Sequence, residues 1–363
     1  METNNILNKA LELKAISLDE SVFIYKNANT SELVFYANEI RKKLHPNKII
    51  TYIIDRNINI TNVCISRCKF CNFHCVPKAK DAYITTIDEY LKKIDELYAL
   101  GGKQILLQGG LHPELGLKYY TSLFKELKSH YPNLKLHALG PPEIFHIAKL
   151  ENTSYQNILT SLVEAGLDSL PGAGAEILSK RVRKIVSPAK CSANEWLDIM
   201  HIAHKLNILT SSTMMFGHIE TAEERIEHLI KLRDVQNNKP KTSVGFISFT
   251  PWPFQDENTV LQKKHNVNNN VTINDYIRLI AISRIVLINI ENIQASWLTV
   301  GTKTGQIALN AGANDFGSIM IEENVVSAAG ANYSLNQKGI EKQISEAGYT
   351  PRQRNQMYNY VGF

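Results

Sequence analysis

The feature that most restricts the fold of this 363-residue chain is a regular alternation of short apolar runs with amphipathic helical stretches. The runs have the length and composition of buried strands, and strands that alternate with helices pair in parallel through right-handed crossovers. The expected strands are Ile49–Ile54, Gln104–Gln108, Lys135–Leu139, Ser169–Leu170, Leu209–Phe216, Ser243–Thr250, Ile288–Ser296 and a segment near Gly317–Ile321, and the expected helices include Thr86–Leu100, Tyr119–His130, Ala193–Lys205 and Ala222–Gln236. About eight such units predict an α/β fold, a (β/α)8 barrel of the TIM type, with an open doubly wound sheet as the alternative.

The two ends of the chain are expected to lie outside this barrel. Residues 1–46 predict an N-terminal helical segment, because Ser17-Leu-Asp-Glu20 fits a capping box and residues 31–44 have helical apolar spacing. The barrel is expected over residues 47–330, and residues 331–363 are expected to form a C-terminal helical tail.

Composition and charge restrict the possible partners. Hydrophobic residues make up 44% of the chain and charged residues 21%, which is typical of a folded globular protein. The net charge of +5 comes from scattered basic residues, so no nucleic-acid partner is expected. The N-terminus lacks the pattern of a signal peptide, and the most apolar stretch, residues 276–290, contains Arg278 and Arg284. We therefore expect a cytoplasmic protein with no membrane partner.

Four of the five cysteines lie between residues 64 and 75, and this cluster says most about function. In a reducing compartment, clustered thiols indicate metal or redox chemistry before disulfides. Cys64, Cys68 and Cys71 have the spacing C-x3-C-x2-C, and three thiolates in one loop can hold three irons of a [4Fe–4S] cluster while the fourth iron stays open. Cys75 would complete a compact four-thiolate site, so structural zinc or a structural cluster is the alternative.

This spacing, with the aromatic Phe70 directly before the third cysteine, resembles the signature of the radical S-adenosylmethionine (SAM) superfamily. The resemblance implies that Cys64, Cys68 and Cys71 bind a [4Fe–4S] cluster and that the methionyl amine and carboxylate of SAM chelate its open iron. One-electron reduction by a low-potential donor, such as flavodoxin or ferredoxin, would then cleave SAM to methionine and a 5′-deoxyadenosyl radical. The position of the loop, directly after the first expected strand, agrees with this resemblance.

Other glycine-rich and polar segments follow the expected strands, which in a barrel places them at the mouth where active sites are built. The resemblance implies that Phe70, Gly109 and Gly110 contact SAM; glycines let the backbone approach a ligand closely, although they also suit a tight turn. Glu176, in a Gly-Ala-Gly-Ala-Glu loop, resembles the acid that contacts SAM, and Arg183 would pair with the SAM carboxylate. As isolated residues, both would be ordinary charges near a helix terminus.

The resemblance extends from about residue 55 to residue 329, and it is closest to the family of cyclases in the futalosine route to menaquinone. The segments that carry it are Asp55-Arg-Asn-Ile-Asn-Ile-Thr-Asn62, Leu170-Pro-Gly-Ala-Gly-Ala-Glu-Ile-Leu178, Met214-Met-Phe-Gly-His218, Phe249-Thr-Pro-Trp-Pro-Phe-Gln255 and Glu322-Glu-Asn-Val-Val-Ser-Ala-Ala329. The implied substrate is dehypoxanthine futalosine, in which a ketone joins a ribose-derived sugar to a benzoate. The implied reaction is hydrogen abstraction at ribose C4′ followed by carbon–carbon ring closure to the cyclic product.

Five residues are candidates for substrate chemistry, and each has a structural alternative. His218 and Glu220 follow the fifth strand and would orient the sugar or accept the final proton. Arg56 has the planar fork that matches a carboxylate, Trp252 would pack on the benzoate, and Asp315 would bind sugar hydroxyls. The alternatives are buried hydrogen bonds, salt bridges and core packing.

Two other functions stay open on the sequence alone. The first is aminofutalosine synthase, a relative of the cyclases within the same superfamily, whose adenosyl radical adds to an enol ether. The second is a non-catalytic scaffold that holds an iron–sulfur cluster or zinc for structural purposes. A cluster with an open iron would respond to SAM, whereas a four-thiolate site that includes Cys75 would not.

Overall fold

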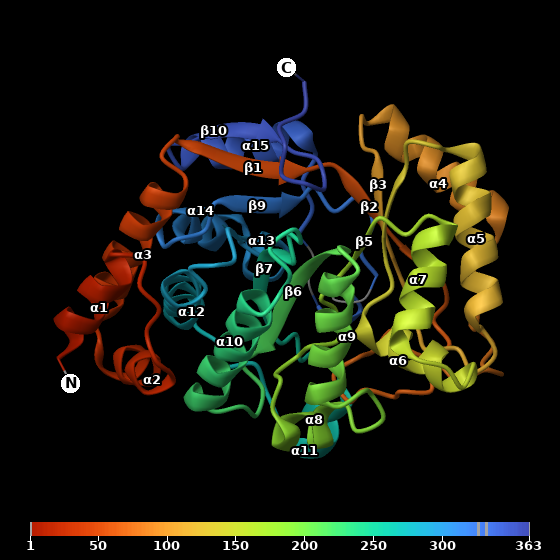
Figure 1. Cartoon of the computed structure of the whole chain (residues 1–363), viewed down its shortest axis with the longest axis horizontal. Helices are drawn as coiled ribbons and strands as arrows, with labels where there is room; N and C mark the ends of the chain where they lie inside the picture. The colour runs from red at the N-terminus through yellow and green to blue at the C-terminus, as the bar shows by residue number, and fades with distance from the viewer. Residues whose placement is uncertain (1, 325–326, 331–332, 363) are drawn as a thin grey trace.

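The computed structural model describes residues 2–324, 327–330 and 333–362. Its central element is a seven-stranded sheet in which strands that follow one another along the chain lie side by side and run in parallel (Figure 1). The strands are β2 (Asp55–Asn59), β3 (Gln104–Gln108), β4 (Lys135–Ala138), β5 (Ser169–Leu170), β6 (Leu209–Phe216), β7 (Phe246–Pro253) and β8 (Asn292–Ile293). This sequential order is the order that a barrel requires.

The sheet closes on itself through β1 (Ile49–Ile53) and β9 (Asp315–Ser318). β1 runs almost without a break into β2, and β9 pairs with β1 in parallel. On its other side β9 meets the end of β8, where Gln294 bridges to Asp315. The seven strands of the sheet and β9 therefore surround one interior, and the predicted (β/α)8 barrel is confirmed.

Helices cover the outside of the barrel. They are α4 (Ile87–Ala99), α5 (Leu117–His130), α6 (Pro141–Leu150), α7 (Tyr155–Ala165), α8 (Lys180–Val186), α9 (Ala193–Lys205), α10 (Ala222–Asn237), α11 (Val260–His265), α12 (Ile273–Val286), α13 (Trp297–Val300) and α14 (Thr302–Asn310). Several begin with a capping box, such as Ser192 with Glu195 at α9, which satisfies free N–H groups of the first turn. No helix among the described residues is both long enough and apolar enough to span a bilayer.

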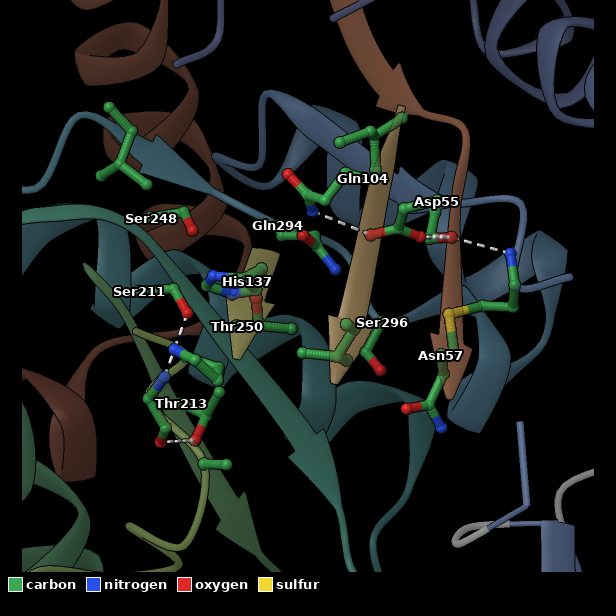
Figure 2. Close-up of a pocket in the computed structure, with 18 of the residues that line it drawn as sticks. Asp55, Asn57, Gln104, His137, Ser211, Thr213, Ser248, Thr250, Gln294 and Ser296 are labelled. Atoms are coloured by element: carbon green, nitrogen blue, oxygen red, sulfur yellow. Dashed lines mark hydrogen bonds between the residues drawn. The ribbon is translucent and has the colours of Figure 1, made fainter. Parts of the chain in front are cut away.

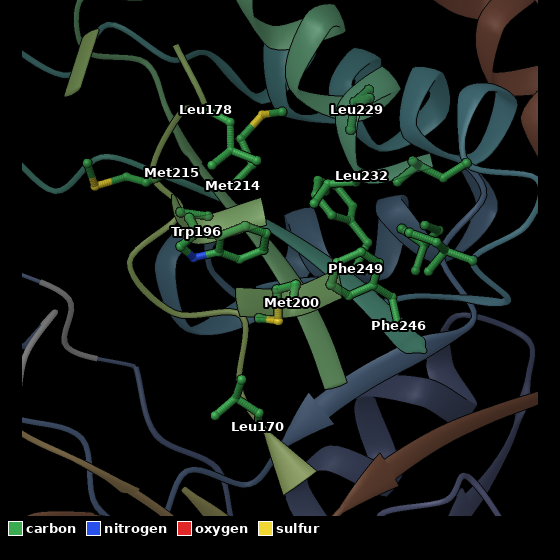
Figure 3. Packing of buried hydrophobic residues seen from close by; sticks show 14 of the residues in the cluster. Leu170, Leu178, Trp196, Met200, Met214, Met215, Leu229, Leu232, Phe246 and Phe249 are labelled. Carbon is green, nitrogen blue, oxygen red and sulfur yellow. The ribbon is translucent and has the colours of Figure 1, made fainter. Parts of the chain in front are cut away.

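The layer between the helices and the strands is closely packed. Figure 3 shows Trp196 and Met200 of α9 and Leu232 of α10 against Met214 of β6 and Phe249 of β7, and all five are buried. Each such side chain contributes roughly 1.5–3 kcal/mol when it is fully buried. The outward faces of the strands thus supply the apolar core, which leaves their inward faces free to be polar.

Three helices precede β1 in the chain: α1 (Thr3–Leu11), α2 (Leu18–Asn27) and α3 (Thr30–Leu44). The expected capping box at Ser17 is present. Arg278 of α12 donates a hydrogen bond to the carbonyl oxygen of Tyr25 at 2.5 Å, and this bond ties α2 to the outside of the barrel.

The C-terminal part contains the short helix η1 (Ser327–Ala329), the helix α15 (Gln337–Glu346) and a strand, β10 (Thr350–Gln353). The sequence analysis did not predict β10, because Thr-Pro-Arg-Gln has no apolar alternation. This strand is held instead by backbone pairing with the edge of β1. Residues 325–326 of one resemblance segment, and residues 331–332 and 363 of the predicted tail, lie outside the described residues.

The strand β2 is the second difference from the sequence analysis. The expected strand ended at Ile54, and the Asp-Arg-Asn-Ile-Asn segment that follows it entered the sequence analysis only as part of the resemblance. In the structure Ile58 faces the apolar core, whereas Asp55, Asn57 and Asn59 line the barrel interior. Alternation with period two therefore produces a strand whose polar face points inward.

Candidate active site

The barrel interior contains two adjoining cavities, which share lining residues such as Asn57 and Trp252. The upper chamber, of about 310 Å³, lies at the carboxyl ends of the strands and is lined by Cys64, Cys68 and Cys71 among others. The lower chamber, of about 300 Å³, lies deeper and is lined by polar side chains from most strands (Figure 2). Barrels of this type usually fill that space with branched apolar side chains, so a polar and hollow interior indicates a ligand site.

The loop after β2 places three of its four cysteines on the upper chamber. Cys64, Cys68 and Cys71 line the chamber, whereas Cys75 does not. The backbone of Cys75 instead pairs with Asn62 (N···O 2.9 Å) and with Cys64 (O···N 3.1 Å), and these bonds close the loop. This arrangement fits a three-thiolate cluster site better than a four-thiolate site.

The surroundings of Cys68 also fit a cluster. Burial raises the pKa of its thiol to about 11 although Lys190 is nearby, so the free side chain is neutral at pH 7. Such a thiol becomes a thiolate ligand when a bound metal compensates the charge. The hydroxyl of Ser66 lies 3.3 Å from the sulfur and forms a hydrogen bond with it.

Gly109 and Gly110, at the end of β3, lie directly against the cysteine loop and line the upper chamber. A Cβ atom at Gly110 would lie 2.2 Å from the carbonyl oxygen of Val63 and 2.9 Å from Cβ of Cys64. The backbone N–H of Gly110 donates to Thr61 at 2.8 Å. The absence of a Cβ atom at Gly110 therefore lets the end of β3 pack closely against the cluster loop.

Glu176 is a buried carboxylate on the wall of the upper chamber, between two cations. Its oxygens lie 2.8 Å from Nζ of Lys190 and 3.1 Å from Nη1 of Arg183. Burial alone would raise the pKa of Glu176, but Lys190 and Arg183 more than compensate and lower it. Glu176 is therefore a fixed negative charge beside the cysteines.

Arg183 does not line the chamber. Its guanidinium donates to the carbonyl oxygens of Gly174 and Ala175 at 2.9 and 2.8 Å, and its Nε donates to Cys191 at 3.0 Å. It lies behind Glu176 and holds the loop that carries this residue. The structure thus places Arg183 behind the chamber wall, away from the position of a direct SAM ligand.

Lys190 is the cation of this group that reaches the chamber, and the sequence analysis missed it. It lines the upper chamber, and its Nζ lies 5.3 Å from the ring centroid of Phe70, another lining residue. The run Ser-Pro-Ala-Lys-Cys around Lys190 has no motif, so only the fold shows that it faces Glu176 and the cluster loop.

His218 and Glu220 do not line either chamber, so the predicted acid–base roles lack a geometric basis. In the turn after β6, the ring of His218 bonds the carbonyl oxygen of Met215 (3.0 Å) and the N–H of Ile219 (2.8 Å). Burial lowers the pKa of His218, so it stays neutral. Glu220 accepts from the N–H of His218 at 3.0 Å and pairs with Arg225 at 2.7 Å. Both side chains fold back on their own turn instead of pointing into the barrel.

We therefore expect Glu220→Gln to lower stability rather than catalysis. The substitution weakens the bonds to the turn and leaves Arg225 without its buried counter-charge, which costs about 1–3 kcal/mol. Thermal unfolding should begin at a lower temperature, while turnover per folded molecule stays close to the wild-type value. A loss of turnover in a fully folded Glu220→Gln protein would contradict this expectation and support a catalytic role for Glu220.

Arg56 and Asp315 are also placed differently from the prediction. Arg56 projects from β2 to the outside of the barrel, where it pairs with Glu96 and with Glu322 at 3.0 Å. Asp315 is fully buried and pairs with Arg354 at 2.6 Å, so its oxygens are engaged by the protein. The period-two alternation of β2 explains the first case, since Asp55 faces inward and its neighbour must face outward. Neither side chain lines a chamber.

The lower chamber carries the polar groups that sequence reasoning did not select. In Figure 2, Asp55, Asn57 and Gln104 point into it, and Asp55 accepts a hydrogen bond from Gln104 at 3.1 Å. Oδ1 of Asn57 and Oε1 of Gln104 are buried and have no hydrogen-bond partner in the described chain. Buried polar atoms are nearly always paired in folded proteins, so these two indicate that a ligand supplies the partner. Trp252 lines both chambers, as a residue that packs on a substrate ring would.

A closed parallel barrel with a cysteine triad beside a polar interior is the architecture of a radical SAM enzyme, and comparison with known proteins agrees. A family model described as the radical SAM superfamily matches residues 58–232, and one described as the CofH/MqnC C-terminal region matches residues 243–363. Together with the relatives described next, these matches show that the chain belongs to the radical SAM superfamily, whose members use a [4Fe–4S] cluster and SAM.

Two curated relatives are cyclic dehypoxanthine futalosine synthases. The one from Streptomyces coelicolor is 42% identical over 98% of this chain and 88% of its own length, and the one from Halalkalibacterium halodurans is 40% identical over 99% and 95%. A 5-amino-6-(D-ribitylamino)uracil–L-tyrosine 4-hydroxyphenyl transferase from Methanopyrus kandleri is 40% identical over 90% and 88%.

Two solved structures share the fold at low sequence identity. Methylornithine synthase (PylB) has a TM-score of 0.69 with 17% identity, over 95% of this chain and 97% of its own. The FeFe-hydrogenase maturase HydG from Carboxydothermus hydrogenoformans has a TM-score of 0.75 with 13% identity, over 98% and 80%.

Proposed function

We propose that the chain is a radical SAM cyclase that converts dehypoxanthine futalosine to cyclic dehypoxanthine futalosine in menaquinone biosynthesis. The observation that carries this proposal is the similarity to two synthases of that name over 98–99% of the chain, which includes both chambers. The cysteine triad at the upper chamber and the polar interior below it supply the chemical groups that such a reaction needs.

In this proposal the upper chamber holds the cofactors. Cys64, Cys68 and Cys71 bind the cluster, and when bound the cluster and SAM supply the 5′-deoxyadenosyl radical that takes hydrogen from ribose C4′. Glu176 and Lys190 present one negative and one positive charge side by side, which matches the ammonium and carboxylate of an amino acid. Arg183 acts on this pair only by holding Glu176 in place.

The lower chamber holds and shields the substrate. Hydroxyl groups of the sugar would satisfy the unpaired amide oxygens of Asn57 and Gln104, while Trp252 packs on the aromatic ring. The closed barrel keeps water and oxygen away from a radical that reacts with most C–H bonds. The contribution of the protein is therefore position and exclusion, which bring the ring and the sugar carbon together for ring closure.

The transferase of Methanopyrus kandleri supports a second candidate function, because it has the same 40% identity as one of the two synthases, over 90% of this chain against 99%. In that reaction the substrates would be L-tyrosine and 5-amino-6-(D-ribitylamino)uracil. The two functions differ in substrate and not in cofactor, so substrate-dependent product formation decides between them.

Anaerobic turnover tests the proposal. Protein reconstituted with iron and sulfide is incubated with SAM, a low-potential reductant and either dehypoxanthine futalosine or the two transferase substrates, and the products are read by mass spectrometry. A product two hydrogens lighter than dehypoxanthine futalosine, together with 5′-deoxyadenosine, is the expected result. A tyrosine-derived adduct from the second mixture would establish the transferase. No 5′-deoxyadenosine from cluster-loaded protein would favour a structural cluster.

The charge of the surface around the cluster loop indicates which kind of electron donor would bind there. Basic residues gather around the cluster loop because Lys69 bonds through its backbone to Val186 at the end of α8 and to Leu261 in α11, each at 2.9 Å. The residues of this basic rim are Arg67, Lys69, Lys184, Lys263 and Lys264. None of them forms an ion pair within the described chain, and four are exposed. An acidic one-electron carrier, of the flavodoxin or ferredoxin kind, would complement this rim beside the cluster.

Reversing two of these charges should slow reduction by the carrier alone. We expect Lys184→Glu with Lys263→Glu to raise the carrier concentration for half-maximal turnover by about tenfold at low salt, because rim charges steer association. Turnover driven by a small chemical reductant should not change. Lys48→Glu with Lys241→Glu is the matched control, because both lysines are exposed, form no ion pair within the described chain and precede β1 and β7 at the opposite end of the barrel. Equal effects of the two double variants would exclude docking at the rim.

A further inference from the structure

The lower chamber ends on the C-terminal part of the chain. After β10, the N–H of Arg354 continues the ladder with β1 by donating to the carbonyl oxygen of Tyr52 at 2.8 Å. The side chains of Arg354 and Gln356 then line the lower chamber, and Gln356 donates to the hydroxyl of Ser169 on β5. The segment that follows β10 is thus the floor of the barrel interior.

The floor lies far from the cysteines. Arg354 is level with Tyr52, whereas the cysteine loop begins beyond Asn59, seven residues further along the continuous strand formed by β1 and β2. At about 3.3 Å per residue, this separation is on the order of 23 Å. A substrate that reacts beneath the upper chamber therefore directs its far end toward Arg354.

Arg354 differs from the other groups around the lower chamber in its charge. Among the described lining residues it is the one with a permanent positive charge. His137 also lines the chamber, but burial lowers its pKa to about 3, so it is neutral. The acids that line this chamber are Asp55 and Glu323. Burial raises the pKa of Asp55, which favours its uncharged form.

The guanidinium of Arg354 is held in place by hydrogen bonds that engage only some of its N–H donors. Asp315 accepts from its Nε at 2.6 Å and from Nη2 at 3.1 Å, and Asn355 accepts from Nη1 at 3.3 Å. These bonds engage three of the five N–H groups of an arginine, so within the described residues one is left on each Nη atom. Asp315 is itself fixed by Thr51, whose hydroxyl donates to it at 2.5 Å. One N–H group on each Nη atom is the number of donors that a bidentate carboxylate accepts from.

We propose that Arg354, oriented by Asp315, binds a carboxylate of the substrate at the floor of the barrel. The inference rests on the proposed function, in which this carboxylate belongs to the benzoate ring. The sugar then faces the upper chamber, and the ring end points toward the tail. Arg354 takes the role that the sequence analysis gave to Arg56, and Asp315 is a positioning residue rather than a ligand for sugar hydroxyls.

The test compares dehypoxanthine futalosine with its methyl ester, which lacks the negative charge. Binding of each compound is measured by calorimetry on the cluster-loaded protein with SAM and without reductant. The main variant is Arg354→Gln with Asp315→Asn, because removing both charges leaves no unpaired charge in the buried site. We expect the wild-type protein to bind the acid on the order of 10- to 100-fold more tightly than the ester, and the double variant to bind both equally.

Two further variants keep the test decisive. Arg354→Lys preserves the charge but not the fork, so the acid should keep only part of its advantage. Arg56→Gln removes a comparable buried arginine from the outward face of β2 and should leave the ratio of acid to ester unchanged. Thermal melting checks that each variant is folded.

The outcomes separate this inference from the function it rests on. If the wild-type protein binds acid and ester equally, or if the double variant keeps the preference for the acid, Arg354 is not the carboxylate site even though cyclisation proceeds. If the wild-type protein binds neither compound and forms no cyclic product, the proposed function fails and the inference fails with it.

Discussion

Replacing Cys68 by alanine should produce a folded protein that binds no cluster and forms no 5′-deoxyadenosine. Cys68 is the most buried of the three cysteines on the upper chamber, and among the described residues its sulfur has Ser66 as its one hydrogen-bond partner. Two thiolates cannot hold a cluster that needs three protein ligands and an open iron. Iron content, the visible absorption of the cluster and product formation would be measured on anaerobically reconstituted protein.

The matched control is Cys75→Ser, in the same loop. Cys75 contributes backbone hydrogen bonds but does not line the chamber, so the serine variant should keep its iron and its activity. Loss of the cluster in Cys75→Ser together with retention in Cys68→Ala would contradict the triad and favour a different ligand set. An active Cys68→Ala enzyme would exclude radical chemistry at this loop.

The second large effect is expected from Gly110→Ala, a change of a single methyl group. The new Cβ would lie 2.2 Å from the carbonyl oxygen of Val63 and 2.9 Å from Cβ of Cys64, so the cluster loop must move. Overpacking of this kind costs about 1–3 kcal/mol, which corresponds to roughly a 10- to 100-fold lower population of the correct loop conformation. We expect iron content and SAM binding to fall together.

Gly109→Ala provides the comparison one residue earlier. Its Cβ would meet the backbone of Thr61 at 3.0 Å or more, a contact that small shifts can relieve, so this variant should lose much less iron. If Gly110→Ala kept full iron content but lost SAM affinity, the glycine would act directly on SAM instead of through the loop. Iron analysis and calorimetry with SAM distinguish these results.

Much of the barrel could be predicted because its strands are short apolar runs with clear borders. Gln104–Gln108, Ser169–Leu170 and Leu209–Phe216 have the predicted bounds. β2 and β10 could not be predicted in this way. The first carries a polar face for a hollow interior, and the second is held by its backbone alone. Propensity arguments assume that the side chains of a strand pack, and neither strand meets that assumption.

In the candidate site, too, some residues could be predicted from the sequence and others could not. The cysteine triad is local in the sequence, so its spacing was sufficient to predict it. His218 and Arg56 were selected as polar residues near strand ends, but the direction of a side chain depends on turn geometry and on strand alternation. Lys190, Asn57 and Gln104 had no motif at all.

The sequence by itself determined the class of fold, the cluster loop and the family, because these depend on periodicity and on residues that are neighbours along the chain. Only the tertiary structure decided which charges meet. Glu176 pairs with Lys190 on the wall of the upper chamber, and Asp315 holds Arg354 at the floor, from segments 14 and 39 residues apart. Side-chain direction and long-range pairing follow from how strands close into a barrel, and no local pattern encodes that closure.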